Sequence, residues 1–438
     1  MDRDGEQMLG GLIAAHHLTP MDDLPALLVA YAGLAGFSEP LLYLADLQQQ
    51  YLVPLPGQHL PDGSPPQRLR IDTTLAGRAY RSLYLVSSTK TRDPGAADPD
   101  EEGLDEARPG EGGPRRWWLP LLDGTDRMGV LAMTAPVDDD DTRRRAHWLA
   151  SLLAMVIAAK GATSDTYATV VRDRPMDLSA EVLWSLLPAK TFATDRIVVT
   201  AALEPAYQIG GDAFDYALTR DTLNLAIFDA MGHDLTAGLT SAIAIGAFRN
   251  HRLRGDGLRA VGEAIDGAIA QQFARTQFAT GILATLDIRT GVLTWVNRGH
   301  PPPLLLRQGH VVAELATEPD PPMGLWLGAY EDPAHYQLQP GDRLLCYTDG
   351  VVEAKDPHGR EFGLDRFVDF IARHEADQVS APETLRRLVQ ALLQYQQGVL
   401  QDDATVLLAE WQSQAYAPLG THRYYAVTRR APRMPSGS

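Results

Sequence analysis

Apolar positions recur at helical and strand-like spacings along the chain, and changes in this pattern divide the chain into zones. In the first zone, Leu24–Ala35 has apolar residues at helical spacing, while Leu41–Ala45 and Tyr51–Val53 form a pattern typical of a β-hairpin. A second pair of strand patterns, Trp117–Leu122 and Met128–Thr134, is joined by an Asp-Gly dipeptide, which favours a tight hairpin turn. The first zone, residues 8–160, is therefore predicted to be an α+β domain.

Two polar segments in this zone need separate interpretations. Residues 91–114 are rich in Pro, Gly, Asp and Glu and have no apolar periodicity, so we expect a disordered loop there. Further on, Asp138–Asp141 precedes Arg143–Arg145, so that carboxylates lie at the positive end of a helix and arginines follow one turn later. Because consecutive carboxylates on a helix do not converge on one point, this run predicts a helix start and not a metal site.

A connector and a tail flank the most regular part of the chain. Residues 161–190 have helical patterning, with the apolar residues of Leu178–Leu187 at core-like spacing. Ser179 is a candidate cap for this connector, and Pro188 closes it. The tail, residues 413–438, has little pattern and is expected to be flexible.

Strand patterns alternate with helical ones in the third zone, residues 191–412. The expected strands are Ile197–Ala202, Leu223–Phe228, Ile282–Leu286, Val292–Val296, Leu304–Leu306, Leu344–Tyr347 and Thr405–Ala409. The expected helices are Leu235–Leu253, Ala260–Phe273, Leu364–His374 and Pro382–Gln397. This order predicts an α/β domain with a largely antiparallel sheet covered by helices, and the whole chain is expected to be α/β and multi-domain.

The composition sets the class of protein. With 438 residues the chain is long enough for two or three domains, and 45% hydrophobic with 22% charged residues is typical of soluble globular proteins. The longest apolar stretches, such as Leu149–Ala159, are shorter than the roughly 20 residues that cross a bilayer, and the acidic start lacks the features of a signal peptide. The single cysteine, Cys346, excludes a disulfide within the chain. We therefore expect a cytoplasmic protein.

The charge balance narrows the range of partners. The formal net charge is -17, which argues against nucleic acid or an anionic membrane as the main partner. Acidity is compatible with divalent cations, although a solvated surface accounts for most carboxylates.

Four aspartates of the third zone lie where expected strands begin or end. Asp212 follows Gly-Gly beyond the first strand, Asp229 and Asp349 follow later strands, and Asp402 precedes the last one. Each alone fits a turn or a loop, as Asp349-Gly350 illustrates. Strand ends, however, are where a sheet can bring distant side chains together, so the ordered set indicates a common site.

Carboxylates gathered in this way need a counter-charge. Without arginine or lysine they would repel one another strongly, and hard divalent cations remove that repulsion. Ligation by oxygen alone favours Mg²⁺ or Mn²⁺ over zinc. Two such ions roughly 3.5–4 Å apart can hold a bridging water, lower its pKa and bind a phosphate for in-line attack. The aspartates therefore predict hydrolytic phosphate chemistry.

Several blocks of the third zone carry a resemblance to a known family. They are Gly210–Asp215, Asp229–His233, Asn297–Pro303, Tyr347–Ala354, Glu361–Gly363 and Asp402–Thr405. In this order they resemble the metal-dependent serine/threonine phosphatases (PPM), in particular the SpoIIE-like bacterial branch. The resemblance implies an α-β-β-α sandwich for this domain and a protein-serine/threonine phosphatase activity.

The same resemblance implies roles for single residues. Asp212 and Asp229 would bind two central Mn²⁺ or Mg²⁺ ions, with Asp229 bridging them and the Ala230 carbonyl as a further ligand. Asp349 and Asp402 would complete the shell of the second ion, Asp402 being preferred over its neighbour by the register of the family. A metal-activated water would hydrolyse phosphoserine or phosphothreonine on a protein. Substrates in this branch are often anti-sigma-factor antagonists, so a phosphorylated STAS-type protein is the implied partner.

The chain departs from the family pattern at three positions. Ala230 and Asp234 stand where the family has glycine, and Arg298 stands where it has a small residue. A carbonyl ligand does not require glycine, so Ala230 is compatible with the role above if its φ is negative. Asp234 adds a carboxylate near the cleft, which would either bind metal or weaken phosphate binding. Arg298 could contact phosphate, but we expect it to be exposed.

Two histidines lie within the same blocks. His233 is a candidate for acid or base chemistry, because histidine titrates near neutrality and Asp229 is close in sequence. For His300, which precedes three prolines, we expect a structural role in fixing its loop through a hydrogen bond.

The first zone resembles a GAF domain. The segments that carry this resemblance are Ile71–Tyr80, Trp118–Leu122 and Gly129–Ala132. Sensor domains of this kind often precede the phosphatase in the SpoIIE-like branch, and they bind small ligands or mediate dimerisation. Both a small-ligand sensor and a purely structural dimerising domain remain open, and a homodimer is expected.

Two other functions were weighed. Gly210–Phe214 differs at one position from the Gly-Gly-Asp-Glu-Phe signature of diguanylate cyclases, but that motif does not predict the blocks around Asp229, Asp349 and Asp402. The second alternative is a catalytically weak sensor or scaffold with a degenerate phosphatase domain, which Asp234 supports. The intact set of four aspartates argues against it, so the predicted function is a metal-dependent protein phosphatase in bacterial signalling.

Overall fold

The chain forms two units, Met1–Arg174 and Pro175–Ser438, and each is described by itself. The computed structural model describes residues 3–88, 113–205, 207–208, 210–328, 330–377, 379–397, 400 and 402–412. The loop expected at 91–114 lies outside the described residues, except for residues 113 and 114, and so does the tail expected at 413–438.

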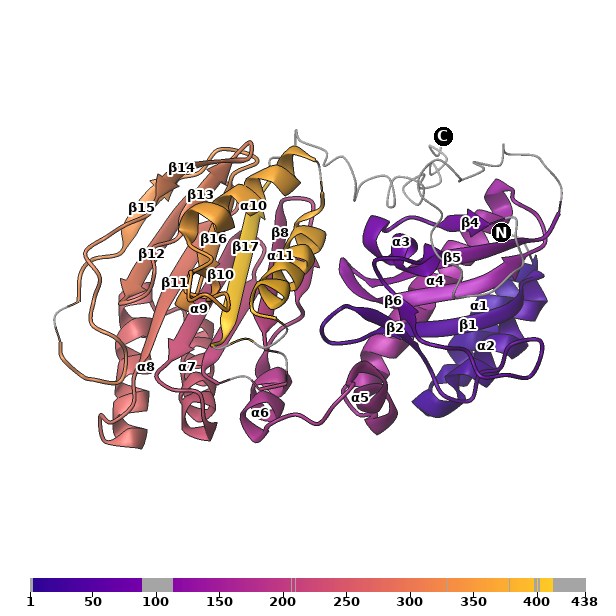
Figure 1. Ribbon diagram of the computed structural model, residues 1–438, viewed down its shortest axis with the longest axis horizontal. Helices are drawn as coiled ribbons and strands as arrows, with labels where there is room; N and C mark the ends of the chain where they lie inside the picture. Colours follow the sequence, from indigo (N-terminus) through magenta and orange to yellow (C-terminus); the bar gives the residue numbers. More distant parts are fainter. Residues whose placement is uncertain are drawn as a thin grey trace, which may run out of the picture. The chain divides into compact units, whose positions relative to one another are not determined.

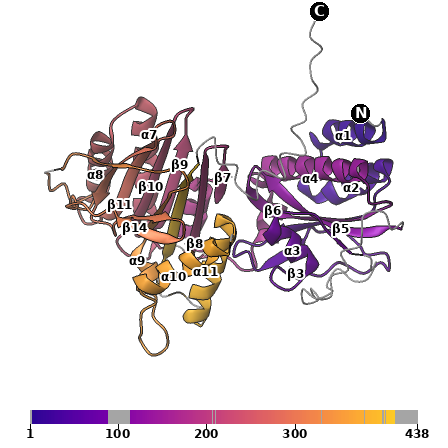
Figure 2. The same cartoon turned by 90° about the horizontal axis from the view of Figure 1, so that it is seen from above.

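The N-terminal unit is built on one antiparallel sheet. Its strands are β1 (Ser38–Ala45), β2 (Tyr51–Pro54), β3 (Leu69–Arg70), β4 (Val86–Ser88), β5 (Arg115–Asp123) and β6 (Asp126–Ala135), in the spatial order β3-β2-β1-β6-β5-β4. Its helices are α1 (Arg3–His16), η1 (Met21–Asp23), α2 (Leu24–Ala32), η2 (Gly33–Ala35), α3 (Leu75–Ser82), α4 (Asp140–Gly161) and α5 (Asp165–Val171). Helices α1, α2 and α4 cover one face of the sheet and α3 covers the other (Figure 2). This unit is therefore α+β, as predicted.

Local sequence signals explain the main elements of this unit. The predicted hairpin forms, with Tyr43 of β1 opposite Pro54 of β2. The Asp-Gly dipeptide turns the chain between β5 and β6, and Gly124 there has a φ of +62°, a conformation that glycine adopts without strain. Helix α4 begins after Asp139, whose side chain accepts the N–H of Thr142 at 2.7 Å. The run of aspartates is therefore a helix start, as predicted.

The C-terminal unit contains two antiparallel sheets. The first has the order β15-β12-β11-β10-β9, formed by β9 (Asp212–Leu218), β10 (Thr222–Ala230), β11 (Ala279–Asp287), β12 (Val292–Arg298) and β15 (Ala334–Gln337). The second has the order β14-β13-β16-β17-β8-β7, formed by β7 (Thr191–Ala193), β8 (Ile197–Glu204), β13 (Leu304–Arg307), β14 (His310–Glu314), β16 (Arg343–Tyr347) and β17 (Ala404–Trp411). The helices are α6 (Leu178–Leu186), α7 (Leu235–Arg254), α8 (Leu258–Phe273), α9 (Asp349–Val352), α10 (Leu364–Ala376) and α11 (Ala381–Tyr395).

These elements stack as four layers. Helices α7 and α8 pack on the sheet that contains β9 to β12, and α9 and α11 pack on the other sheet, with α10 against them (Figures 1 and 2). The α-β-β-α sandwich implied by the resemblance is thus confirmed.

Successive side chains of a strand point to opposite faces of its sheet, so a central strand can contribute to two hydrophobic cores. Along β17, Leu407 and Ala409 point into the core between the sheets, whereas Val406 and Leu408 point into a second core under α10 and α11. A strand buried on both faces has no polar alternation, which is why this part of the chain reads as a continuous apolar run.

Several elements were not anticipated. Strands β7, β14 and β15 are short or exposed, so they lack a strong apolar signal. Strand β9 was missed because Asp212 and Asp215 interrupt its apolar positions, although both side chains are buried. The prediction that Ser179 caps α6 was wrong, because Asp177 occupies the cap position. Ser179 is a buried residue of the helix, and a Cβ added at Gly238 would lie 2.7 Å from the Cβ of Ser179.

In the part of the chain that the structure describes, no single helix is both long and apolar enough to cross a bilayer. Helices α4 and α5 have the length and composition of a membrane span only when taken together, and the chain bends by 107° between them.

Candidate metal centre

The first two candidate ligands meet on neighbouring strands. Asp212 opens β9 and Asp229 lies near the end of β10, and the two residues are directly opposite each other in the antiparallel ladder. Side chains of such opposite residues point to the same face, with Cβ atoms about 5 Å apart. The register therefore brings the two carboxylates together.

The other two candidates come from the second sheet. Asp349 is the first residue of α9, directly beyond β16, and Asp402 lies just before β17. Strands β16 and β17 are antiparallel neighbours with Tyr347 opposite Val406, so the end of one and the start of the other lie side by side. Asp229, Asp349 and Asp402 thus lie at the strand ends that the sequence pattern indicated, whereas Asp212 opens β9, a strand that the pattern missed.

Asp403 has a different task from its neighbour Asp402. Its Oδ2 atom accepts the backbone N–H groups of Gly210 at 2.7 Å, Gly211 at 2.7 Å and Asp212 at 3.1 Å. Asp402 is exposed, and its Oδ1 accepts the N–H of Asp403 at 2.9 Å. Asp403 therefore fixes the Gly-Gly-Asp loop of the opposite sheet, and its pattern of contacts favours Asp402 as the ligand.

Burial and mutual repulsion shift the titration of these carboxyl groups. Burial, followed by the charges of Asp229 and Asp403, raises the pKa of Asp212 well above its ordinary value. Burial and the charges of Asp349, Asp402 and Asp403 raise the pKa of Asp229 to about 7. Burial raises the pKa of Asp349 and, despite the three backbone N–H bonds, that of Asp403. The aspartates therefore interact electrostatically across the two sheets.

The donor set suits a hard divalent cation. All the candidate side chains offer oxygen, and the groups that raise their pKa values are other carboxylates, so a cation would relieve the repulsion. In the part of the chain that the structure describes, however, no three His, Cys, Asp or Glu side chains converge into a ready-made metal cage. The carboxylates thus lie at adjoining strand ends and interact electrostatically.

The glycines of the site allow close approach between its segments. A Cβ at Gly350 would lie 1.9 Å from the Asp403 carbonyl oxygen, and a Cβ at Gly211 would lie 2.4 Å from the Ala230 carbonyl oxygen. Distances below about 3 Å are not tolerated, so both positions require glycine. The Ala230 carbonyl thus lies against the backbone of the residue that precedes Asp212.

A cavity elsewhere in this unit is separate from the carboxylates. It has a volume of about 580 Å³ and is lined by residues of the β7–β8, β9–β10 and β11–β12 turns. These turns lie at the other end of the strands: Leu218, in its lining, is six residues along β9 from Asp212, or roughly 20 Å at 3.3 Å per residue. We place the candidate site at the aspartates and not at this cavity, because carboxylate oxygens are suitable ligands for a divalent cation.

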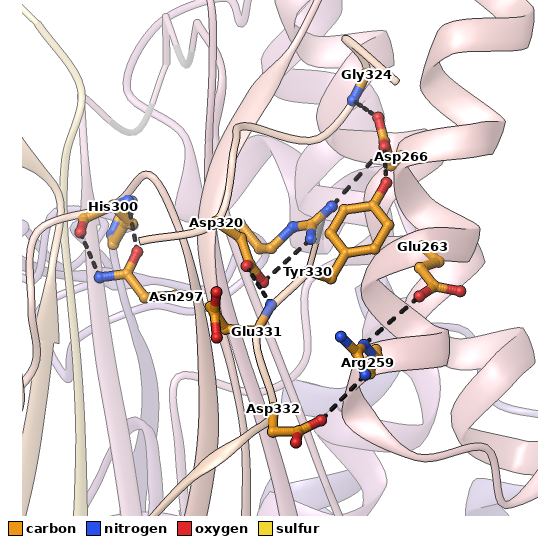
Figure 3. Close-up of polar contacts among 11 residues, drawn as sticks. Arg259, Glu263, Asp266, Asn297, His300, Asp320, Gly324, Tyr330, Glu331 and Asp332 are labelled. Carbon is orange, nitrogen blue, oxygen red and sulfur yellow. Dashed lines mark hydrogen bonds and ion pairs between the residues drawn. The ribbon is translucent and has the colours of Figure 1, made fainter. Parts of the chain in front are cut away.

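His300 is a buried residue beside this site. Its Nδ1 is 2.9 Å from Oγ1 of Thr280, the residue opposite Asp229 on β11. Its backbone N–H and C=O are both bonded by the Asn297 side chain at 2.8 Å (Figure 3). Burial lowers the pKa of His300 to about 3, so its ring is neutral near pH 7. The expected structural role of His300 is confirmed by these bonds.

His233 and Asp234 lie in the exposed loop that leads into α7. His233 is exposed, and a Cβ at Gly210 would lie 2.6 Å from its Cα. Asp234 is the N-cap of α7, because its Oδ1 accepts the N–H groups of Thr236 at 2.9 Å and Ala237 at 3.1 Å. An Asp immediately before a helical pattern is a cap signal, so this role is readable from the sequence, while the effect of Asp234 on metal or phosphate binding stays a prediction.

The prediction that Arg298 is exposed was wrong. Its side chain is 2% exposed, and it forms ion pairs with Asp320 at 3.3 Å and Asp266 at 3.9 Å (Figure 3). Its guanidinium carbon also lies 4.2 Å from the centre of the Tyr330 ring, whose hydroxyl donates to Asp266. Two carboxylates distant in sequence make it possible to bury this charge.

Comparisons with known proteins show what this unit is similar to. Residues 219–412 match the profile described as Stage II sporulation protein E (SpoIIE). The chain is 25% identical over 240 residues to Phosphoserine phosphatase RsbU of Bacillus subtilis (strain 168), covering 53% of this chain and 69% of the relative. It is 22% identical over 185 residues to Phosphoserine phosphatase RsbP of the same organism, covering 41% of this chain but only 45% of RsbP.

A solved structure overlaps the same half of the chain. The SiaA-PP2C domain of Pseudomonas aeruginosa is 24% identical, and the overlap covers 49% of this chain and 86% of that domain with a TM-score of 0.43. The matched segment, residues 219–412, contains Asp229, Asp349 and Asp402, while Asp212 lies seven residues before its start.

Proposed function

We propose that this chain, whose C-terminal unit carries a SpoIIE-family phosphatase domain of the PP2C type, is a metal-dependent protein-serine/threonine phosphatase. The observation that carries the proposal is the register of the two sheets, which brings Asp212, Asp229, Asp349 and Asp402 to adjoining strand ends with electrostatically coupled carboxylates. The similarity to two phosphoserine phosphatases, RsbU and RsbP, supports the same function.

The residues that would hold two Mn²⁺ or Mg²⁺ ions are the four aspartates and the Ala230 carbonyl. When bound, divalent ions supply an activated water and neutralise the charge on the phosphoryl oxygens. Asp229 is the carboxylate coupled to the largest number of others, namely Asp212, Asp349, Asp402 and Asp403, which suits a residue shared by both ions. Asp403 and Thr348 would keep Asp212 in place, and His300 would support the β11 end of the site.

The proposed substrate is phosphoserine or phosphothreonine on a protein. The relatives RsbU and RsbP are named phosphoserine phosphatases, and we extend this to a STAS-type anti-sigma-factor antagonist as the partner of this chain. The chain spans 69% of RsbU and less than half of RsbP, so the substrate of the whole protein is part of the proposal.

The experiment that tests the substrate uses a STAS-type protein phosphorylated on serine. Incubated with the full chain, it should lose its phosphate in the presence of Mn²⁺ and keep it when the metal is chelated. Persistence of the phosphoprotein with metal present, alongside hydrolysis of an unrelated phosphoserine peptide, would overturn the choice of substrate and leave the phosphatase activity standing.

A second candidate function is a sensor or scaffold with little catalytic power. The observation that favours it is the lack of a ready-made cage of three metal-ligating side chains among the described residues. Calorimetric titration of the metal-free chain with Mn²⁺ separates the two functions. The phosphatase requires saturable binding that is lost in Asp229→Asn, whereas a scaffold binds no Mn²⁺ at this site.

We further propose that residues 8–160 are a GAF-like sensor domain, followed by a connector at 161–190 and the phosphatase domain at 191–412. In this arrangement the N-terminal unit would bind a small ligand or hold two chains together as a homodimer. The independent core of that unit, built on one sheet with helices on both faces, supports a separate role for it.

A further inference from the structure

The Asp212 side chain is held by a residue of the opposite sheet. The Thr348 hydroxyl donates to Asp212 Oδ2 at 2.7 Å and accepts the backbone N–H of Thr405 at 2.9 Å. A hydroxyl has one hydrogen, and the N–H of Thr405 can only donate, so the geometry assigns that hydrogen to the carboxylate. The direction of both bonds is therefore fixed.

Thr348 is itself immobilised by its surroundings. Its side chain is completely buried, and its backbone N–H donates to the Thr405 carbonyl at 3.0 Å. Both the hydroxyl and the backbone of Thr348 are thus tied to the start of β17. When a bound cation keeps Asp212 ionised, a hydrogen bond from this fixed donor is about twice as strong as a neutral one and sets the orientation of the carboxylate.

The position of Thr348 in the sequence adds a second connection. It is the residue before Asp349 and the cap position of α9, so its backbone also determines where the Asp349 side chain starts. One residue thus connects Asp212 of the first sheet, through its hydroxyl, with Asp349 of the second sheet, through the chain.

We propose that Thr348 is a positioning residue that orients Asp212 for binding a divalent cation and sets its spacing from Asp349. This inference rests on the proposed function, because it assumes that both aspartates are ligands. In the absence of the hydroxyl, Asp212 would lose the bond to Oδ2, and the cation would have to supply more of the ordering of this carboxylate, which lowers the affinity.

The test compares variants that differ only by the hydroxyl. Thr348→Val keeps the shape of the side chain and removes the hydroxyl, whereas Thr348→Ser keeps the hydroxyl. Mn²⁺ affinity is measured by calorimetric titration of the metal-free full chain, independently of activity. We expect Thr348→Val to bind Mn²⁺ about tenfold or more weakly, since hydrogen bonds to charged groups contribute more than neutral ones. Thr348→Ser should stay within about threefold of the unsubstituted chain.

Two controls separate positioning from general damage. Thr200 is equally buried in β8, and its hydroxyl pairs with that of Thr191 at 3.3 Å, away from the aspartates. Thr200→Val should therefore leave Mn²⁺ affinity unchanged. If Thr348→Val does not fold, the pair Thr348→Ala and Thr348→Ser makes the same comparison, because both leave a similar space and only Ser retains the hydroxyl.

The outcomes distinguish this inference from the proposed function. Equal Mn²⁺ affinity in Thr348→Val and Thr348→Ser, or in the Ala and Ser pair, would overturn the positioning role even if the chain is an active phosphatase. Saturable Mn²⁺ binding that weakens with loss of the hydroxyl, in a chain that hydrolyses no phosphoester, would support the positioning role while the proposed activity fails.

Discussion

Asp402 and Asp403 are neighbours in sequence with different partners in the structure. Asp403 Oδ2 accepts three backbone N–H groups, whereas Asp402 is exposed just before β17. An asparagine at 403 can still present one oxygen to those N–H groups, but an asparagine at 402 loses the charge that a cation requires.

We therefore expect the two amide substitutions to have different effects. Asp402→Asn should reduce Mn²⁺ affinity and phosphate release at least a hundredfold. Asp403→Asn should retain both within about tenfold, because its amide oxygen can still accept the backbone N–H bonds of the Gly-Gly-Asp loop. Calorimetry and a phosphate-release assay measure the two quantities. The reverse order of metal affinities would identify Asp403 as the ligand.

The raised pKa of Asp229 predicts a pH dependence of stability. Its folded value is about 7 against an ordinary 3.8, so between these values the folded chain binds more protons than the unfolded chain. Stability of the metal-free protein should therefore fall as pH rises through this window. The His300 contribution has the opposite sign, but its window, from about 3 to 6.5, ends below neutrality.

Comparison with Asp229→Asn isolates this contribution. Without metal, the melting temperature of the variant should exceed that of the unsubstituted chain by an amount that grows from pH 5 to pH 8. With saturating Mn²⁺ at pH 8 the order should reverse, because a cation stabilises only the chain that can bind it. A difference in melting temperature that is constant with pH would contradict the raised pKa.

At the level of single residues, the sequence predicted which residues belong to the candidate site better than it predicted the burial and the partners of a side chain. Asp229, Asp349 and Asp402 were recognisable because apolar runs lie within two residues of them. The burial of Arg298 was not, because it depends on Asp266 and Asp320, which the fold brings to it from α8 and from the loop after β14. The capping role of Asp234 was readable from the start of the helical pattern.

Among the elements, the loop that contains Asp320 and Glu331 is held by the Arg298 cluster. This cluster consists of Arg298, Asp266, Asp320 and Tyr330. Asp320 Oδ1 accepts the N–H of Glu331 at 2.8 Å, and Asp266 Oδ1 accepts the N–H groups of Gly324 at 2.6 Å and Trp326 at 3.0 Å. The other oxygen of each carboxylate faces Arg298 (Figure 3). The cluster thus ties this loop to both α8 and β12.

Removing the charge of Arg298 should therefore be costly. Arg298→Met leaves two buried carboxylates without their partner, and we expect a loss of about 3–5 kcal/mol in the free energy of unfolding. Arg259→Met is the control, because Arg259 pairs with Asp332, which is 90% exposed, and should lose less than about 1 kcal/mol. Urea unfolding measures both. Similar losses in the two variants would contradict the structural importance of the cluster.

The predictability of the elements follows their burial. Strands with unbroken apolar runs, such as β10 and β17, were located within one or two residues of their ends at most. Strand β9 was missed because two of its buried residues are Asp212 and Asp215, and Asp215 is buried through ion pairs with Arg249 at 2.7 Å and Arg252 at 2.9 Å on α7. Such pairing depends on tertiary structure, which a pattern of apolar positions does not contain.

On the scale of the whole molecule, the two units have separate hydrophobic cores. A chain that lacks residues 1–165 keeps the whole C-terminal unit and should fold and bind Mn²⁺. If the N-terminal unit is a regulatory or dimerising domain, the truncation should change the rate of phosphate release or the oligomeric state measured by light scattering. Unchanged behaviour in both would rule out that role.

The central claim is that the four aspartates form a metal-dependent phosphatase site. Its most direct test is the release of inorganic phosphate from a phosphoserine peptide as Mn²⁺ is titrated into the metal-free full chain, beside Asp229→Asn. The proposed function predicts saturable, Mn²⁺-dependent release by the unsubstituted chain and a loss of at least a hundredfold in the variant. Equal release by both proteins at every Mn²⁺ concentration, or none by either, would contradict it.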